Sequence, residues 1–338
     1  MDPEIASRPI FLFTHPRTAS NLLMKMLRDH PGLGIIEYPF VDTYYYGKES
    51  LTLRDNDRMR SAKKRLHDHP ALCQTFQAAF DQLEQTIQST HATGRIPFIK
   101  EHAFTLVRPE VISQNLGRDI PPRTTPRVIA RALPTAADQA ALDGNPTVLP
   151  TQFLLGVTPV FLIRHPALVF ESILRVSGPT MGARVDDEEF LVDASLRWLR
   201  LLHDWFARGG ASANGGVRRP IVLNADEVMA RPTVVQKLCE RLRVDPGDVC
   251  FQWDPVAPSV LEAQGSYHQH FFSTIQTSSG VQLDKHSAPD GRPLDLDAMA
   301  ESWQEAHGSD AAAALRSFVA AAMPDYEYLS QFELQLES

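Results

Sequence analysis

The stretch FLFTHPRTASNLLMKML, residues 11–27, decides the fold of the N-terminal part of this chain. Its first three residues are apolar, as in a buried strand, and leucines and methionines at helical spacing follow from residue 22. Between them lies a short polar turn, residues 14–21. Where a strand, a turn and a helix follow one another, the first N–H groups of the helix point out of the turn and, with the helix dipole, attract an anion. We therefore predict an anion site in this turn, most often a phosphate site.

The side chains of the turn support the same interpretation. Arg17 places a fixed positive charge in it, and Thr18 and Ser20 lie beside Arg17 with hydroxyl groups. Charged and hydroxyl donors next to backbone N–H groups form stronger, charge-assisted hydrogen bonds with an anion.

The alternation of strands and helices continues along the chain. We expect strands at 9–14, 33–37, 96–100, 158–163 and 220–224, and helices at 20–30, 57–90 with a break near residue 70, 167–175, 188–207, 232–242 and 310–322. Such alternation predicts the α/β class, with three layers in which helices cover both faces of a central, mainly parallel sheet. Ligands bind such sheets at the carboxyl ends of the strands, where the polar turns 14–21, 100–102 and 164–166 are expected.

Length and composition narrow the function classes. The chain has 338 residues, 43% hydrophobic and 22% charged, with a formal net charge of −8. This acidic balance gives no sequence-wide basic field for nucleic acid, so an anionic ligand has to be held by a local cluster. We expect one domain over 1–338, with the proline-rich stretch 117–150 as a lid or substrate loop.

Cofactor chemistry and location are bounded by what the sequence lacks. The three scattered cysteines suit neither a disulfide framework nor a zinc site, and we expect no metal. No secretory signal and no membrane span are expected, which makes a cytoplasmic location the default.

Four motifs follow one another along the chain: PRTASN at 16–21, KEH at 100–102, RHPALVFES at 164–172 and a strand–helix unit at 222–244. In this order they resemble motifs of the sulfotransferase family. The first resembles the family's 5′-phosphosulfate loop, and the third resembles its 3′-phosphate motif, in which Arg and Ser are eight residues apart. Lys100-Glu101-His102 resembles a K-x-H at the end of an early strand, and VLNADEVMARPTVVQKLCERLRV at 222–244 resembles a later strand–helix unit. Together the motifs span about residues 9–245, and they imply a fold like that of the P-loop nucleotide triphosphatases.

The resemblance implies a donor, 3′-phosphoadenosine 5′-phosphosulfate, as co-substrate and a hydroxylated small molecule as acceptor, with no metal. The donor's 5′ end would be bound by loop residues, which are Arg17, Thr18, Ala19, Ser20 and Asn21. Arg164 and Ser172 would bind its 3′-phosphate. His102 is the expected base for the acceptor hydroxyl, and Lys100 would hold the sulfate oxygens, so Arg17, Lys100 and His102 are the catalytic candidates.

Two alternatives remain open. In the first, the scaffold has lost donor use and catalyses another step on a metabolite, such as dehydration, cyclisation or another transfer. Ala19 and Asn21, where the family has Gly and a second hydroxyl, and the missing C-terminal R-K-G-x-x-G favour it. In the second, the chain is a kinase-like nucleotide binder, although no G-x-x-x-x-G-K-[ST] match is present.

Overall fold

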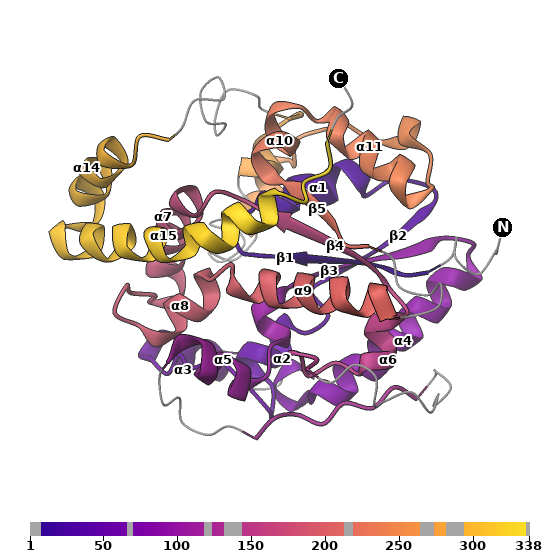
Figure 1. Cartoon of the computed structure of the whole chain (residues 1–338), viewed down its shortest axis with the longest axis horizontal. Helices are drawn as coiled ribbons and strands as arrows, with labels where there is room; N and C mark the ends of the chain where they lie inside the picture. The colour runs from indigo at the N-terminus through magenta and orange to yellow at the C-terminus, as the bar shows by residue number, and fades with distance from the viewer. Residues whose placement is uncertain are drawn as a thin grey trace. The chain divides into compact units, whose positions relative to one another are not determined.

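The computed structural model describes residues 8–65, 70–117, 124–131, 144–212, 219–263, 274–281 and 294–335. It contains a five-stranded sheet with the order β2-β3-β1-β4-β5, whose strands are labelled in Figure 1. The strands are β1 (Ile10–Thr14), β2 (Leu33–Glu37), β3 (Ile96–His102), β4 (Thr158–Ile163) and β5 (Ile221–Asn224). The pairings β1–β3, β1–β4 and β2–β3 are all parallel. The expected α/β class with a central parallel sheet is thereby confirmed.

The chain forms two compact units. The first comprises Met1–His15, Gly32–Phe161 and Arg197–Ile221, and the second Pro16–Pro31, Leu162–Leu196 and Val222–Ser338. Helices of the first unit are α2 (Val41–Tyr46), α3 (Asp57–Arg65), η2 (Pro70–Cys73), α4 (Phe76–Ala92), η3 (Ala103–Leu106), α5 (Pro109–Leu116), α6 (Thr151–Leu155) and α9 (Arg197–Ser212). Those of the second are α1 (Ser20–Leu27), α7 (Pro166–Met181), α8 (Glu188–Ala194), α10 (Ala225–Ala230), α11 (Thr233–Leu242), η4 (Pro246–Asp248), α12 (Pro258–Ala263), α14 (Leu296–His307) and α15 (Ser309–Ser330). The expectation of one domain over 1–338 stays a prediction.

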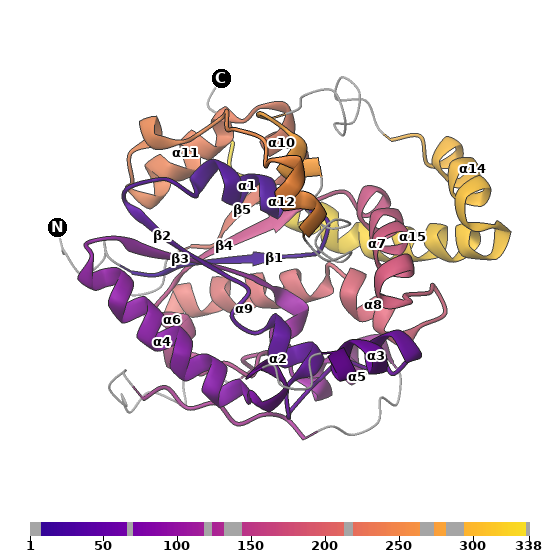
Figure 2. The same cartoon turned by 180° about the vertical axis from the view of Figure 1, so that it is seen from behind.

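Strand β1 forms the core of the first unit because all five of its side chains are buried. A parallel strand covered on both faces reads as a continuous apolar run, as IFLFT does. Helix α9 packs along this part of the sheet, where the ring of Phe206 lies 5.7 Å from that of Phe13 and 6.2 Å from that of Phe161 (Figures 1 and 2). These aromatic contacts pack the end of β1 into the core, just before the loop that the sequence predicts as an anion site.

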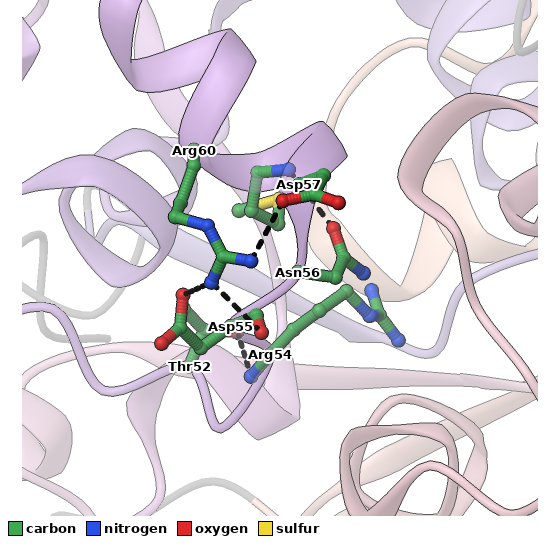
Figure 3. A network of polar contacts seen from close by, with 7 residues as sticks. Thr52, Arg54, Asp55, Asn56, Asp57 and Arg60 are labelled. Carbon is green, nitrogen blue, oxygen red and sulfur yellow. Dashed lines mark hydrogen bonds and ion pairs between the residues drawn. The ribbon is translucent and has the colours of Figure 1, made fainter.

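A polar network shapes the chain just before α3 (Figure 3). Asn56 accepts a hydrogen bond from the N–H of Met59 at 2.9 Å and so caps the helix start. Arg60 donates to Asp55 at 2.7 Å and to Asp57 at 2.8 Å. These ion pairs are exposed and join residues close together in the sequence, so they contribute little beyond local order.

Three expectations differ from the structure. The strand at 96–100 continues through residue 102, because the polar groups there find partners inside the sheet. The helix expected at 188–207 is two helices, α8 and α9, separated at Ser195, whose backbone is extended. The helix expected at 310–322 runs on to Ser330 and includes Pro324.

The predicted lid, 117–150, is described only in part, because residues 118–123 and 132–143 lie outside the described residues. The segment 124–131 runs beside α4. Gln77 of α4 accepts from the N–H of Ile129 at 2.8 Å and donates to its carbonyl at 3.0 Å. The described part of this stretch is therefore attached to a helix of the first unit, and its function as a lid stays a prediction.

Candidate functional site

The loop between β1 and α1 has a backbone suited to an anion. Arg17 and Ala19 both adopt left-handed conformations, with φ of 65° and 53°. Alternation of left-handed and ordinary backbone turns successive N–H groups toward one side and makes a concavity that binds anions. Helix α1 begins at Ser20 and has no acidic residue in its first turn, so no carboxylate there opposes the positive end of its dipole.

Two of the sequence-predicted phosphate motifs meet in the second unit. The Nε of Arg17 donates to the hydroxyl of Ser172 at 3.0 Å, although the two residues are 155 positions apart. Arg164 donates through Nη1 to the backbone carbonyl of Arg17 at 3.1 Å. Both Arg164 and Ser172 are buried. The structure thus places two guanidinium groups and a buried hydroxyl around one loop.

A carboxylate holds Arg164 in this arrangement. Asp226, at the start of α10, accepts from the Nε of Arg164 at 3.2 Å. Asn224 accepts from the N–H of Asp226 at 2.9 Å, which caps α10 and orients the carboxylate. Burial raises the pKa of Asp226, and the guanidinium of Arg164 acts in the opposite direction. We call the four side chains of Arg17, Arg164, Ser172 and Asp226 the anion-loop cluster.

The K-x-H motif lies in the first unit, at the carboxyl end of β3. The parallel register places His102 opposite Thr14, the last residue of β1. The Oγ1 of Thr14 is 2.8 Å from Nδ1 of His102 and 3.2 Å from the carbonyl oxygen of Glu101. Burial lowers the pKa of His102 well below its ordinary value, and the charges of Lys100 and His15 lower it further. His102 is therefore a neutral imidazole at pH 7.

Glu101 is a buried carboxyl group that fixes the backbone around His102. It is 0% exposed, and its two oxygens accept from the N–H groups of Phe40 and His102, each at 2.7 Å. Burial raises the pKa of Glu101 to about 7, while these two hydrogen bonds limit the rise. The carboxyl group thus connects β3 to the start of α2.

Lys100 and His102 share an aromatic neighbour. The Nζ of Lys100 lies 4.3 Å from the centroid of the Tyr38 ring, a cation–π distance, and the rings of Tyr38 and His102 are 4.9 Å apart. Tyr38 has a left-handed backbone, with φ of 53°, and its N–H donates to the carbonyl of Lys100 at 2.8 Å. We call the five residues Thr14, Tyr38, Lys100, Glu101 and His102 the histidine cluster.

The predicted residues therefore fall into two groups. Arg17, Arg164 and Ser172 come together in the anion-loop cluster, and Thr18, Ala19, Ser20 and Asn21 belong to the same loop or the first turn of α1. Lys100 and His102 come together in the histidine cluster.

The sequence interpretation missed Thr14, Tyr38, Glu101 and Asp226. The sequence does offer one indication of Glu101, which is a carboxyl group at the end of the strand IPFIKEH. A buried acid needs hydrogen-bond partners, so such a residue predicts a specific polar contact.

The described residues contain neither a group of side chains suited to a metal ion nor a helix suited to a membrane. In the part of the chain that the structure describes, no group of three or more His, Cys, Asp or Glu side chains is arranged to hold a metal ion. Among the described helices, none combines the length and the apolar composition that crossing a membrane requires.

The fold and these clusters define an α/β protein with two arginines at the loop after its first strand. Comparisons with known proteins show its family. It is 30% identical over 339 residues to Sulfotransferase ppzF of Metarhizium majus (strain ARSEF 297), covering 97% of each chain. It is also 30% identical to Sulfotransferase ppzF of Metarhizium rileyi (strain RCEF 4871), over 97% of this chain and 96% of that one. The chain belongs to the sulfotransferase family.

Other comparisons add little. No protein-family model matches the chain. A sulfotransferase domain from the curacin biosynthetic pathway aligns over 94% of this chain and 98% of its own, with 13% identity and a TM-score of 0.35. A sulfotransferase from Alicyclobacillus acidocaldarius aligns over 93% and 96%, with 10% identity and a TM-score of 0.38. The family membership follows from the two relatives that are 30% identical to this chain.

Proposed function

We propose that this chain transfers a sulfuryl group from 3′-phosphoadenosine 5′-phosphosulfate to a hydroxyl group of a small-molecule acceptor. The observation that carries the proposal is the hydrogen bond between Arg17 and Ser172, because it joins the loop expected to bind the 5′ end with the motif expected to bind the 3′-phosphate. Since the loop and the 164–172 motif lie side by side, an anion with phosphate groups at two ends suits them better than a single phosphate does.

The residues of the anion-loop cluster fit this donor chemically. Guanidinium groups are the preferred partners of phosphate oxygens, and buried hydroxyls add donors that water does not compete for. Arg164 and Ser172 would bind the 3′-phosphate, and Arg17 with the N–H groups of residues 18–21 would bind the 5′ end. When bound, the donor supplies the sulfuryl group that is transferred.

Arg17 is expected to act on the transition state more than on the ground state. Negative charge grows at the 5′ end during sulfuryl transfer, and a preorganised cation stabilises that charge. The left-handed backbone of Arg17 and the hydrogen bond from Arg164 to its carbonyl fix the residue before the reaction begins. The cation therefore needs little reorganisation as charge develops.

His102 is the proposed general base. It is neutral at pH 7, so one ring nitrogen has a lone pair that can take the proton of an acceptor hydroxyl. Lys100, two residues earlier on β3, provides a positive charge for sulfate oxygens.

Calorimetry with adenosine 3′,5′-bisphosphate, the product left after transfer, tests the donor assignment. Binding is expected in the micromolar range, on the order of 8 kcal/mol. Absence of binding at millimolar ligand overturns the donor assignment. Parallel incubation of candidate acceptors with and without donor separates sulfuryl transfer from the alternative of a donor-independent reaction. That alternative is favoured by Ala19 at a left-handed position where the family has Gly.

A further inference from the structure

The hydroxyl group of Thr14 lies between two groups that compete for it. It is 3.2 Å from the carbonyl oxygen of Glu101 and 2.8 Å from Nδ1 of His102, and Thr14 is 0% exposed. A carbonyl oxygen only accepts hydrogen bonds, and a hydroxyl has one proton to donate. Both contacts are therefore hydrogen bonds only when Thr14 donates to Glu101 and accepts from a protonated Nδ1 of His102.

We propose that Thr14 is a positioning residue that sets the tautomer of His102. It keeps the proton of the neutral imidazole on Nδ1 and leaves the lone pair on Nε2, which is then the atom that takes the acceptor's proton. The inference rests on the proposed function in one respect, the role of His102 as base. In the other tautomer Thr14 donates to Nδ1, the carbonyl of Glu101 loses this donor, and Nε2 already carries a proton.

The contacts of His102 fix the position of its ring, so the tautomer is the main property of the side chain that can still vary. The backbone N–H of His102 donates to Glu101 at 2.7 Å, and its carbonyl accepts from the hydroxyl of Thr105 at 2.8 Å. Its ring lies 4.9 Å from the ring of Tyr38 and 5.8 Å from that of Phe104, centroid to centroid. A ring in contact with two others, in a residue whose backbone N–H and carbonyl are both hydrogen-bonded, keeps its orientation. The hydrogen bonds at Nδ1 then decide which nitrogen is basic.

Nitrogen NMR of the full chain tests the proposal without any reaction. With 15N-labelled histidine at pH 8, two-bond proton–nitrogen correlation distinguishes a protonated ring nitrogen from a bare one, and His102→Gln identifies the signals of His102. The wild-type chain is expected to show a protonated Nδ1 and a bare Nε2. Thr14→Val keeps the shape of the side chain but removes the hydroxyl, so the signals should move toward the Nε2-protonated form that a free histidine side chain prefers. Thr14→Ser, which keeps the hydroxyl, should restore the wild-type pattern.

Kinetics provide the second measurement. Thr14→Val should lower kcat about tenfold, the effect of one lost buried hydrogen bond on the competent tautomer, and Thr14→Ser should recover it. Affinity for adenosine 3′,5′-bisphosphate should stay unchanged in both variants.

A wild-type His102 protonated on Nε2, or a Thr14→Val chain that keeps the wild-type pattern, overturns the proposal. If Thr14→Val does not fold, the wild-type spectrum alone decides. A chain that neither binds the bisphosphate nor transfers sulfuryl groups refutes the proposed function but leaves the tautomer measurable.

Discussion

The anion-loop cluster and the histidine cluster differ in the charge of their central side chains. Arginines form the centre of the first, and a neutral imidazole forms the centre of the second. In the first, the guanidinium groups of two arginines are ordered by hydrogen bonds, that of Arg164 to the carboxylate of Asp226 and that of Arg17 to the hydroxyl of Ser172. In the second, burial works against charge, since it raises the pKa of Glu101 to about 7 and lowers that of His102. On the proposed function, the first cluster binds an anion, and the second keeps an imidazole neutral.

Because of this difference, mutations in the two clusters should affect different properties, namely ligand affinity in one and proton transfer in the other. A charge removed from the anion-loop cluster weakens both ground-state binding and transition-state stabilisation, because the same cation serves both. Removal of the His102 imidazole from the histidine cluster should affect proton transfer and leave binding of adenosine 3′,5′-bisphosphate intact. Measuring the affinity for adenosine 3′,5′-bisphosphate and the turnover on the same variants tests this separation.

The largest effect is expected from Arg17→Met, which keeps much of the side-chain stem and removes the guanidinium group. We expect kcat/KM to fall on the order of 10³-fold, as for loss of one preorganised donor at the site of developing charge. The affinity for adenosine 3′,5′-bisphosphate should fall at least about tenfold with it, since Arg17 binds in both states. Steady-state kinetics and calorimetry measure the two effects.

A matched control for this variant is Arg184→Met. Arg184 lies in the same unit but is exposed and paired with Asp186, two residues away. It should leave both quantities at the wild-type level. Wild-type kcat/KM in Arg17→Met would show that the loop does not act on the reacting group.

His102→Gln should give the next largest effect. Glutamine fills similar space and forms hydrogen bonds but is not a base, so kcat should fall on the order of 10²-fold. The affinity for adenosine 3′,5′-bisphosphate should stay within about twofold of the wild-type value, because His102 is not part of the anion-loop cluster. An equal loss of affinity in this variant and in Arg17→Met would break the comparison between the clusters.

The sequence predicted one cluster better than the other, for a physical reason. Phosphate binding relies on residue types at fixed spacing, so Arg17, Arg164 and Ser172 are visible as a pattern in the amino-acid sequence itself. Thr14 is not, because its position opposite His102, 88 residues later in the chain, depends on the register of two strands. Tyr38 is not visible either, since its left-handed backbone and its contact with Lys100 follow from how the chain leaves β2.

The strands were predictable for the same kind of reason. IFLFT and TPVFLI are apolar runs that have no stable place outside a buried parallel sheet, and the structure places both there. The end of β3 was not predictable from polarity alone. Its last residues are charged and polar, and they remain in the strand because Glu101 finds two backbone donors in the interior.

Glu101 should make the stability of the fold depend on pH. Its pKa is about 7 in the folded chain against 4.5 for an ordinary glutamate carboxyl. Between these values the folded chain keeps a proton that the unfolded chain has lost, so the free energy of unfolding falls as pH rises from about 4.5 to 7. The loss from this group is complete above pH 7 and is on the order of 3 kcal/mol.

Glu101→Gln isolates this contribution, because glutamine stays neutral at every pH. Relative to the wild type, the variant should gain about 3 kcal/mol in unfolding free energy between pH 4.5 and pH 8, measured by urea unfolding. Glu301→Gln, which replaces an exposed carboxyl on α14, is the control for the loss of a charge. Parallel stability curves for the wild type and Glu101→Gln would mean that Glu101 ionises in the folded chain as it does in the unfolded one.

The smallest effect is expected at Ala19, the left-handed residue before α1, where the family has Gly. A left-handed conformation costs a residue with a Cβ about 1–2 kcal/mol, and glycine avoids this cost. Glycine also gives the unfolded chain more freedom, which takes back roughly 0.4–1 kcal/mol. Ala19→Gly should therefore raise the free energy of unfolding by about 0.5 kcal/mol. It should also tighten binding of adenosine 3′,5′-bisphosphate, because glycine lets the backbone approach the anion more closely.

Ala313→Gly, on the exposed face of α15, is the control. It should instead destabilise the chain by about 1 kcal/mol, because helical backbone favours alanine. If both substitutions destabilise the chain equally, the left-handed backbone at Ala19 stores no strain, and the alanine there does not explain any weakness of donor binding.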